Sequence, residues 1–303
     1  MPRPELSLLV VALMGAAASA QPGHKILVAH RGASAYAPEH TLASYRLALS
    51  QGADFVEQDL AVTRDAQLIC LHDATLERTT NVEDVFPNRY TEIVSGGRSK
   101  RVWLANDFTL EEIKRLDAGS WFDPRFAGER VVSFDEAVAL VAGKAGLFPE
   151  LKTPEVYEGR NVHFEELVIA ALDAHHLRGP SADPSTPVIL QTFGEASARR
   201  LAQLGVGVPV VLLLDQADRL DTAAKVQAWK GIVQGFGPAK AIVRTHPDLV
   251  GWAHAAGMMV IPYTFRAADH PGFPSVTAEM EQYLYTLGVD GLFTDNPDQF
   301  PRR

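Results

Sequence analysis

Short runs of apolar, often β-branched residues recur along the chain, and stretches with a helical spacing of apolar positions lie between most of them. Short apolar runs are typical of buried strands, whereas apolar residues three and four positions apart indicate one face of a helix. This pattern predicts strands at 25–30, 54–60, 68–72, 146–152, 187–193, 208–214, 231–237, 258–265 and 290–295. It predicts helices at 41–51, 133–142, 162–175, 196–204 and 247–256.

The alternation of strand and helix predicts the fold class. Repeated about eight times, it favours an α/β chain closed into a (β/α)8 TIM barrel with parallel strands. A doubly wound open sheet is the alternative fold for the same alternation.

One long interval, residues 73–132, interrupts this alternation after the second strand region. It contains scattered Gly, Asn, Arg and Pro residues and one clear helix start at Thr109, where the Thr-x-x-Glu spacing is a capping box. An excursion of this length at the end of a strand favours a lid over the barrel mouth rather than a second domain. We therefore expect residues 21–303 to form one domain with an insertion.

The first twenty residues have the features of a signal peptide. Arg3 precedes the apolar run 8–18, and the small residues of "ASA" at 18–20 form a cleavage site. An amphipathic first helix is the alternative. We expect export, with a mature chain that begins near Gln21. Cys70 is the only cysteine, so an exported chain without disulfides indicates a bacterial periplasm or the secreted space.

Charge and composition limit the classes of partner. The 303 residues carry a formal net charge of −9, which argues against nucleic acid or an anionic membrane surface as a broad partner. Beyond the leading segment no apolar run is long enough to span a membrane, so we expect no stable membrane insertion. Composition sets no oligomeric state.

Polar residues follow nearly every predicted strand, and in a parallel barrel these strand ends meet at one mouth. Glu57 and Asp59 lie two positions apart, so both carboxylates are on one face of a buried strand, and Glu150 ends another strand in "PELK". Buried like charges need a cation between them, and oxygen ligands favour Ca²⁺ or Mg²⁺ over Zn²⁺. The alternatives are ion pairs with arginines or acids that face water at a sheet edge.

Two histidines at strand ends, His30 and His72, are candidates for an acid/base pair because imidazole titrates near neutral pH. A structural, hydrogen-bonded role is the alternative for each. Arg31 and Lys152 are candidates to bind an anionic oxygen cluster, and salt bridges to the same acids are their alternative. Further polar or aromatic residues at strand ends are Gln191, Phe193, Tyr263 and Asp295.

These motifs, in this order, resemble a known family. H-R-G, P-E-x-T, E-x-D and H-D, spread over residues 30–73, are similar to the amino-terminal signature of the glycerophosphodiester phosphodiesterases, which have a (β/α)8 barrel. The resemblance continues through "PELK", "QTF", "PYTFR" and "GVDGLFTDNPD", from about residue 26 to 298. "PEHT", "EQDL" and the leading segment resemble the periplasmic branch of the family.

The resemblance implies metal-dependent hydrolysis of a small glycerophosphodiester to an alcohol and sn-glycerol 3-phosphate. It implies that His30 and His72 are the acid/base pair and that one divalent ion, with Ca²⁺ favoured and Mg²⁺ as the alternative, is held by Glu57, Asp59 and Glu150. It further implies that Arg31 and Lys152 contact the phosphate and that Glu39 supports the site near the metal or the glycerol. The resemblance also makes His40 a mark of the periplasmic subgroup and implies that Gln191 and Asp295 lie behind the contacting residues.

Two other functions are open at the level of the sequence. A phospholipase that acts on intact lipid head groups needs a loop that docks on membranes, for which "GGRSKRVW" at 96–103 is a candidate. A non-catalytic exported binding protein is expected to lack one of the histidines or acids, and this chain has all of them.

Overall fold

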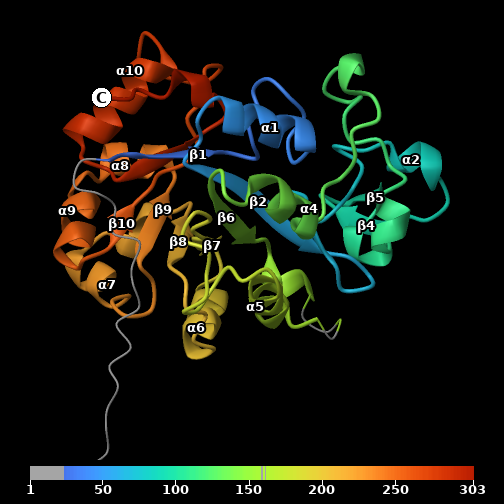
Figure 1. The fold of residues 1–303 in the computed structure, drawn as a ribbon, viewed down its shortest axis with the longest axis horizontal. Coiled ribbons are helices and arrows are strands. Elements are labelled where there is room, and N and C mark those ends of the chain that lie inside the picture. Colours follow the sequence, from blue (N-terminus) through green and yellow to red (C-terminus); the bar gives the residue numbers. More distant parts are fainter. Residues whose placement is uncertain (1–23, 158–159, 161) are drawn as a thin grey trace, which may run out of the picture.

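A parallel barrel forms the centre of the molecule (Figure 1). The computed structural model describes residues 24–157, 160 and 162–303, so the predicted signal segment, residues 1–20, lies outside the described residues. Within the described part, eight parallel strands follow the order β10-β9-β8-β7-β6-β2-β1-β11. They are β1 (Ile26–Ala29), β2 (Phe55–Val62), β6 (Gly146–Leu151), β7 (Leu190–Thr192), β8 (Val210–Leu214), β9 (Gly235–Pro238), β10 (Met259–Val260) and β11 (Gly291–Thr294).

The two ends of this strand order meet, which closes the sheet. The backbone N–H of Asp290, just before β11, donates to the carbonyl of Val260 at 2.9 Å, and Phe265 forms a parallel bridge with Thr294. The predicted TIM barrel is therefore confirmed, and the open doubly wound sheet is excluded.

Helices cover the outside of the barrel (Figure 1). All five predicted helices are present with ends shifted by one or two residues, because side-chain caps fix several starts: Thr41 accepts from the N–H of Ser44, and Ser133 forms a capping box with Glu136. The outer helices are α1 (Leu42–Ser50), α4 (Phe134–Val141), α5 (Phe164–Ala174), α6 (Glu195–Gln203), α7 (Ala223–Gln227), α8 (Lys240–Thr245), α9 (Asp248–Ala255) and α10 (Val276–Glu281). Short 3-10 turns lie at Ala105–Asp107, Pro124–Phe126, Pro154–Tyr157, Ala217–Leu220 and Pro297–Gln299, and a π-helical turn lies at Gln282–Thr286.

The predicted strand at 68–72 is present but shorter, and it lies outside the barrel. It forms β3 (Leu68–Cys70), which pairs antiparallel with the end of β2 through Leu60 and Cys70. β2 extends to Val62, beyond the length that the barrel needs, and a tight turn reverses the chain before β3. As a result, the chain returns along β2 and brings His72 back towards the barrel mouth.

The insertion, residues 73–132, lies at one side of the barrel (Figure 1). It contains α2 (Val82–Val85), the hairpin of β4 (Thr91–Ser95) and β5 (Arg98–Val102), and α3 (Leu110–Ile113). Its capping box at Thr109 is confirmed. The insertion has a small apolar core of its own, which includes Leu76, Val82, Trp103, Phe108 and Ile113.

Strand alternation places an apolar layer inside the barrel and the polar residues above it. Phe55 on β2 and Phe148 on β6 belong to the buried cluster inside the barrel. Glu57, Asp59 and Glu150 occupy the next positions of the same strand faces, nearer the carboxyl ends. The acids therefore lie at the mouth of the barrel, above this apolar layer. Among the described residues, no helix combines the length and the hydropathy needed to cross a membrane.

Candidate active site

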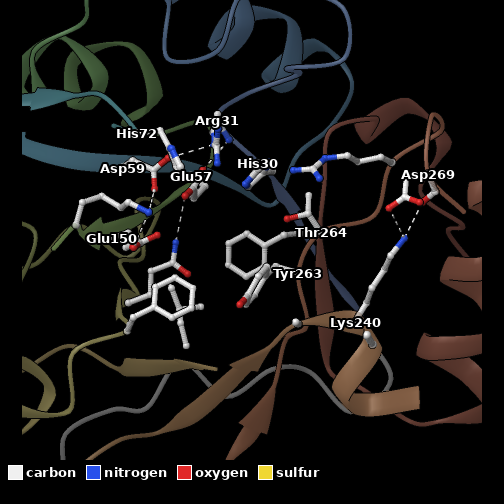
Figure 2. Close-up of a pocket in the computed structure, with 18 residues that line it drawn as sticks. His30, Arg31, Glu57, Asp59, His72, Glu150, Lys240, Tyr263, Thr264 and Asp269 are labelled. Atoms are coloured by element: carbon white, nitrogen blue, oxygen red, sulfur yellow. Dashed lines mark hydrogen bonds and ion pairs between the residues drawn. The ribbon is translucent and has the colours of Figure 1, made fainter. Parts of the chain in front are cut away.

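A pocket of about 330 Å³ opens at the carboxyl ends of the barrel strands (Figure 2). It brings together most of the residues that the sequence predicted for the site: His30, Arg31, Glu57, Asp59, His72, Glu150, Lys152, Gln191, Phe193 and Tyr263. The remaining three, Glu39, His40 and Asp295, contact these residues from behind the pocket wall.

Three carboxylates form the floor of one half of the pocket. In the sheet register Asp59 lies opposite Glu150, and Glu150 lies opposite Gln191. The acids are almost wholly buried, with Glu57 2%, Asp59 1% and Glu150 5% exposed. Burial, and then the neighbouring Asp59, raise the pKa of Glu57 and of Glu150 well above the usual range. Burial and the neighbouring Asp59 therefore both oppose the charged forms of Glu57 and Glu150.

Asp59 is the acid that stays ionised. Burial opposes its charge, but the hydrogen bond from His40 and the charges of Arg31 and Lys152 lower its pKa well below the usual range. The Nε2 of His40 lies 2.8 Å from Asp59 Oδ2, and its Nδ1 lies 2.8 Å from the hydroxyl of Tyr45. Since an ionised carboxylate only accepts, Nε2–H donates to Asp59, and Nδ1 accepts from Tyr45.

The residues that can hold a metal include one that the sequence placed in a supporting role. Among the described residues, His40, Glu57 and Asp59 form a group whose ligand atoms lie within 4.8 Å of one another. Glu150, the predicted third ligand, is outside this group, and its Oε1 pairs with Lys152 Nζ at 3.2 Å. Glu150 and His40 are the two choices of third ligand, and His40 could bind a metal only through a ring nitrogen that gives up its hydrogen bond to Asp59 or Tyr45.

The donor set fits a hard divalent cation. Carboxylate oxygens from adjacent strands are the ligands that Ca²⁺ and Mg²⁺ prefer. In the part of the chain that the structure describes, the buried Oε1 of Gln191 has no hydrogen-bond partner, while its Nε2 lies 3.3 Å from Glu57 Oε1. A bound cation would favour the ionised forms of Glu57 and Glu150, whose charge burial and the neighbouring Asp59 otherwise oppose.

His30 is held by a carboxylate from the neighbouring strand. It follows β1, and its Nδ1 lies 2.6 Å from Oδ1 of Asp295, which follows β11. Arg266 Nε donates to the other oxygen of Asp295 at 2.6 Å. Burial would raise the pKa of Asp295, but His30 and Arg266 lower it to about 2. The ionised Asp295 thus holds the proton of His30 on Nδ1 and leaves Nε2 for the pocket.

His72 has the same arrangement with a different partner. Its Nδ1 lies 2.6 Å from Oδ1 of Asp73, the next residue along the chain. His72 is also about one-third exposed at the pocket, whereas His30 is buried, and burial followed by the charge of Arg31 lowers the pKa of His30. Two imidazoles with a free Nε2 therefore face one pocket.

Two cations lie among the acids. Arg31 pairs with Glu39 through Nη1 at 3.1 Å and with Asp59 through Nε at 3.2 Å, and its backbone N–H donates to Glu57 at 2.7 Å. Arg31 has a φ of 57°, a conformation that turns its backbone N–H towards Glu57. Lys152 lies between Glu150 and the ring of Phe193, with 5.8 Å from Nζ to the ring centre.

The opposite half of the pocket combines aromatic rings with a second group of charged side chains. The rings of Phe193 and Tyr263 pack edge to face with centres 5.8 Å apart, and the Tyr263 hydroxyl donates to the carbonyl of Leu214. Sequence reasoning did not select Lys240 and Asp269, which line this side and are labelled in Figure 2. Lys240 follows the end of β9 by two residues and begins α8, so its place after a strand is a signal that sequence reasoning did not use, whereas Asp269 lies farther from its strand, in the loop after β10.

For a reaction in which His30 transfers a proton, Asp295→Asn is expected to lower kcat by about 10–10²-fold, less than the loss of the histidine itself, because the ring remains while its proton is no longer held on Nδ1. Asp295 raises the pKa of His30, so its removal moves the pH-activity limb of His30 to lower pH. Asp135→Asn, which alters an exposed partner of His175, is the matched control. A variant with wild-type kcat and an unmoved pH profile would contradict this role of Asp295.

The barrel and its mouth define an enzyme with a buried acid cluster, two cations and two histidines, and comparison with known proteins specifies its class. The model of the Glycerophosphoryl diester phosphodiesterase family matches residues 30–299. A Bacillus subtilis (strain 168) glycerophosphodiester phosphodiesterase is 35% identical over 92% of this chain and 86% of its own length. An Arabidopsis thaliana glycerophosphodiester phosphodiesterase is 31% identical over 88% of this chain and 82% of its own.

Solved structures agree with this assignment. The crystal structure of a glycerophosphodiester phosphodiesterase from Agrobacterium tumefaciens matches with a TM-score of 0.67 and 27% identity, over 91% of this chain and 99% of that one. A phosphodiesterase from Oleispira antarctica, solved with the product sn-glycerol-3-phosphate, matches with a TM-score of 0.67 and 25% identity, over 90% and 94% of the two chains. The chain therefore belongs to the glycerophosphodiester phosphodiesterase family and is a phosphoric diester hydrolase.

Proposed function

We propose that the chain hydrolyses glycerophosphodiesters to an alcohol and sn-glycerol 3-phosphate, with a divalent metal and with His30 and His72 as the acid/base pair. The observation that carries the proposal is the convergence in one pocket of two histidines, each tied to a carboxylate through Nδ1, with the acid cluster and two cations. The product in the Oleispira antarctica structure supports the choice of sn-glycerol 3-phosphate.

Charge is the first requirement of the reaction. A phosphodiester is an anion, so a nucleophile approaches it only when the charge on its non-bridging oxygens is balanced. Arg31 and Lys152 line the pocket and provide two positive charges there, with the guanidinium able to bind two oxygens at once. A metal held by Glu57 and Asp59, with His40 or Glu150, would supply further positive charge to the phosphate when bound.

Proton transfer is the second requirement. One histidine accepts the proton of the nucleophile at Nε2, and the other donates a proton to the departing alcohol. The nucleophile is water, or a glycerol hydroxyl of the substrate that would close a cyclic phosphate, which water then opens to sn-glycerol 3-phosphate in a second step. Asp295 and Asp73 keep the two rings oriented through this exchange because each holds Nδ1–H.

The test of the proposed substrate compares a water-soluble diester with an intact lipid. Phosphorus-31 NMR follows glycerophosphocholine and, in a parallel sample, phosphatidylcholine in mixed micelles, each with the purified chain and millimolar Ca²⁺ or Mg²⁺. We expect sn-glycerol 3-phosphate from the first sample and no change in the second. Phosphatidic acid from the second sample, with no product from the first, would replace the proposal with a phospholipase.

We also propose that the chain is exported and belongs to the periplasmic branch, on the support of the segment 1–20 and of "PEHT" at 38–41. Expressed in full in a bacterial host, the protein is expected in the periplasm or the medium with an amino terminus near Gln21. Amino-terminal sequencing of the recovered protein tests this. Protein that stays in the cytoplasm with residues 1–20 still attached would refute it.

A further inference from the structure

Arg78, from the insertion, joins two carboxylates that serve different parts of the site. Its Nε donates to Oδ2 of Asp73. Its Nη1 and Nη2 form a bidentate pair with Glu39, at 3.0 Å to Oε2 and 2.7 Å to Oε1. Three donors of one guanidinium thus fix two acids that come from the β1–α1 loop and from the start of the insertion.

One side of this bridge controls His72. Asp73 offers Oδ1 to His72 Nδ1 and Oδ2 to Arg78, so the arginine holds the carboxylate plane that orients the imidazole. A carboxylate with only one of these partners is free to rotate about its side-chain bonds. The orientation of His72, and the position of its proton on Nδ1, therefore depend on Arg78.

The other side of the bridge controls Arg31. Glu39 accepts from Arg31 Nη1 at 3.1 Å while Arg78 holds both of its oxygens. Glu39 is largely buried, and burial would raise its pKa, but Arg78 and Arg31 lower it to about 2. Without Arg78, Glu39 would keep a single cationic partner and would no longer fix the Arg31 guanidinium in one place.

The insertion places Arg78 by means of its backbone. The N–H of Leu76 donates to the carbonyl of Trp103 at 2.9 Å, and the N–H of Ala105 donates to the carbonyl of Ala74 at 3.0 Å. This pairing, with the apolar core of the insertion beneath it, fixes the segment that leads to Arg78. Arg78 does not line the pocket, so it acts through its partners and not on the substrate.

We propose that Arg78 is a positioning residue that fixes His72 and Arg31 at once, and that carrying this arginine is a catalytic contribution of the insertion, residues 73–132. The proposal rests on the proposed function, because it names His72 and Arg31 as groups that act on the phosphodiester. This role of the insertion differs from that of a lid, because the insertion acts through a fixed bridge in the site and needs no movement.

If Arg78 served only to stabilise the fold, its replacement would lower the free energy of unfolding. The Arg78 side chain is 41% exposed, and ion pairs with partly exposed partners contribute little to folding stability. Arg89, in the same insertion, pairs with Glu112, donates to the carbonyl of Asp107 and stacks on Phe108, all away from the pocket. Arg89→Gln is therefore the matched control for the loss of a bridging arginine.

The first experiment measures kcat and KM for glycerophosphocholine with Arg78→Ala, Arg78→Lys and Arg89→Gln in the full chain. We expect kcat of Arg78→Ala to fall about 10–100-fold, the range typical of residues that orient active-site ligands. Arg78→Lys is expected to retain more activity than Arg78→Ala, because the ammonium keeps the positive charge. Its activity is expected to stay below that of the wild type, because one ammonium does not bridge three carboxylate oxygens. Added guanidinium at millimolar concentration is expected to restore Arg78→Ala several-fold and to leave Arg89→Gln unchanged.

The second experiment separates positioning from general destabilisation and does not depend on activity. Proton–nitrogen NMR of ¹⁵N-histidine-labelled protein, assigned with His72→Gln, reports which ring nitrogen of His72 carries the proton. We expect Nδ1–H in the wild type and in Arg89→Gln, and a substantial Nε2–H population in Arg78→Ala. The effects of Arg78→Ala and Asp73→Asn on this Nε2–H population are expected to be non-additive in a double-mutant cycle, because both changes release the same carboxylate.

The outcomes are distinguishable. An Arg78→Ala variant with kcat within twofold of the wild type, or with the tautomer of His72 unchanged, would overturn the proposal. If the wild type releases no sn-glycerol 3-phosphate, the proposed function fails, and the NMR result still decides whether Arg78 orients His72.

Discussion

Replacing either His30 or His72 with glutamine is expected to lower kcat for glycerophosphodiester hydrolysis by about 10²–10⁴-fold. Glutamine keeps a polar group of similar size in the pocket, but it does not take up or release a proton near neutral pH. In each ring Nδ1 is bound to a carboxylate, so Nε2 is the nitrogen left to exchange a proton, and glutamine has no group that replaces it in this role. His175→Gln, whose ring pairs with the exposed Asp135, is the control for a lost histidine–carboxylate pair.

A second substrate assigns the two roles. A glycerophospho-p-nitrophenyl diester releases p-nitrophenolate, which leaves without a proton. The variant that lacks the general acid is therefore expected to recover most of its rate on this diester, whereas the variant that lacks the general base is not. Thermal melting of both variants checks that the fold is retained. If both variants keep wild-type kcat on both diesters, the two-histidine mechanism is wrong.

The second large effect is expected for Glu57→Gln, which should remove most of the metal affinity and leave the metal-free fold intact. Burial raises the pKa of Glu57, so its ionised form is disfavoured in the folded chain without metal. Glutamine resembles the protonated acid in shape. Because a raised pKa of an acid costs stability at neutral pH, the free energy of unfolding of the metal-free variant is expected to equal or exceed that of the wild type.

The neighbours of Glu57 accommodate this change. The N–H of Arg31 donates to Oε2, which the glutamine carbonyl can replace. The amide nitrogen would then face Gln191, whose Oε1 has no partner and becomes an acceptor when that side chain turns over. The turn takes Gln191 Nε2 away from the carbonyl of Phe148, which it contacts at 3.4 Å, so the substitution exchanges one long buried hydrogen bond for another.

Calorimetry and thermal melting with Ca²⁺ or Mg²⁺ measure the effect. A ligand that binds only the folded state adds about 2.7 kcal/mol to the free energy of unfolding at a hundred times its Kd. We expect this gain in the wild type and its loss in Glu57→Gln, with an affinity decrease of more than about 100-fold, since even residues behind metal ligands contribute 10–100-fold. Equal metal-induced stabilisation of the two proteins would show that Glu57 is not a ligand.

Two further variants decide the third ligand. Glu150 is the choice that the sequence favours, and His40 is the residue that the structure groups with Glu57 and Asp59. Glu150→Gln and His40→Asn are therefore expected to differ in metal affinity, with the larger loss in the variant that lacks the ligand. Similar small losses in both would leave the metal held by Glu57 and Asp59 alone.

Strands with a regular alternation were predictable from the sequence, together with the residues at their ends. On β2 the positions of Phe55, Glu57 and Asp59 follow from the period of two, and β6 repeats the pattern with Phe148 and Glu150. Barrel closure then brings these ends to one mouth, which is why ten predicted residues line one pocket.

The insertion was less predictable, because its contacts depend on tertiary structure. The hairpin β4–β5 is mostly exposed and lacks an alternation of apolar and polar residues, so no strand pattern marks it. Arg78 is one of several arginines in an irregular stretch, and only its distances to Glu39 and Asp73 distinguish it. His40 adopts a φ of 54°, and its approach to Asp59 depends on that local turn.

The central claim is that this acid-lined pocket hydrolyses glycerophosphodiesters with the help of a divalent metal. The most direct test is the release of sn-glycerol 3-phosphate from glycerophosphocholine by the purified chain that begins near Gln21, first with EDTA and then after addition of Ca²⁺ or Mg²⁺. The account predicts activity that chelation abolishes and that one of the two ions restores. Full activity in EDTA would contradict the metal-dependent mechanism, and the absence of product with either ion would contradict the proposed substrate.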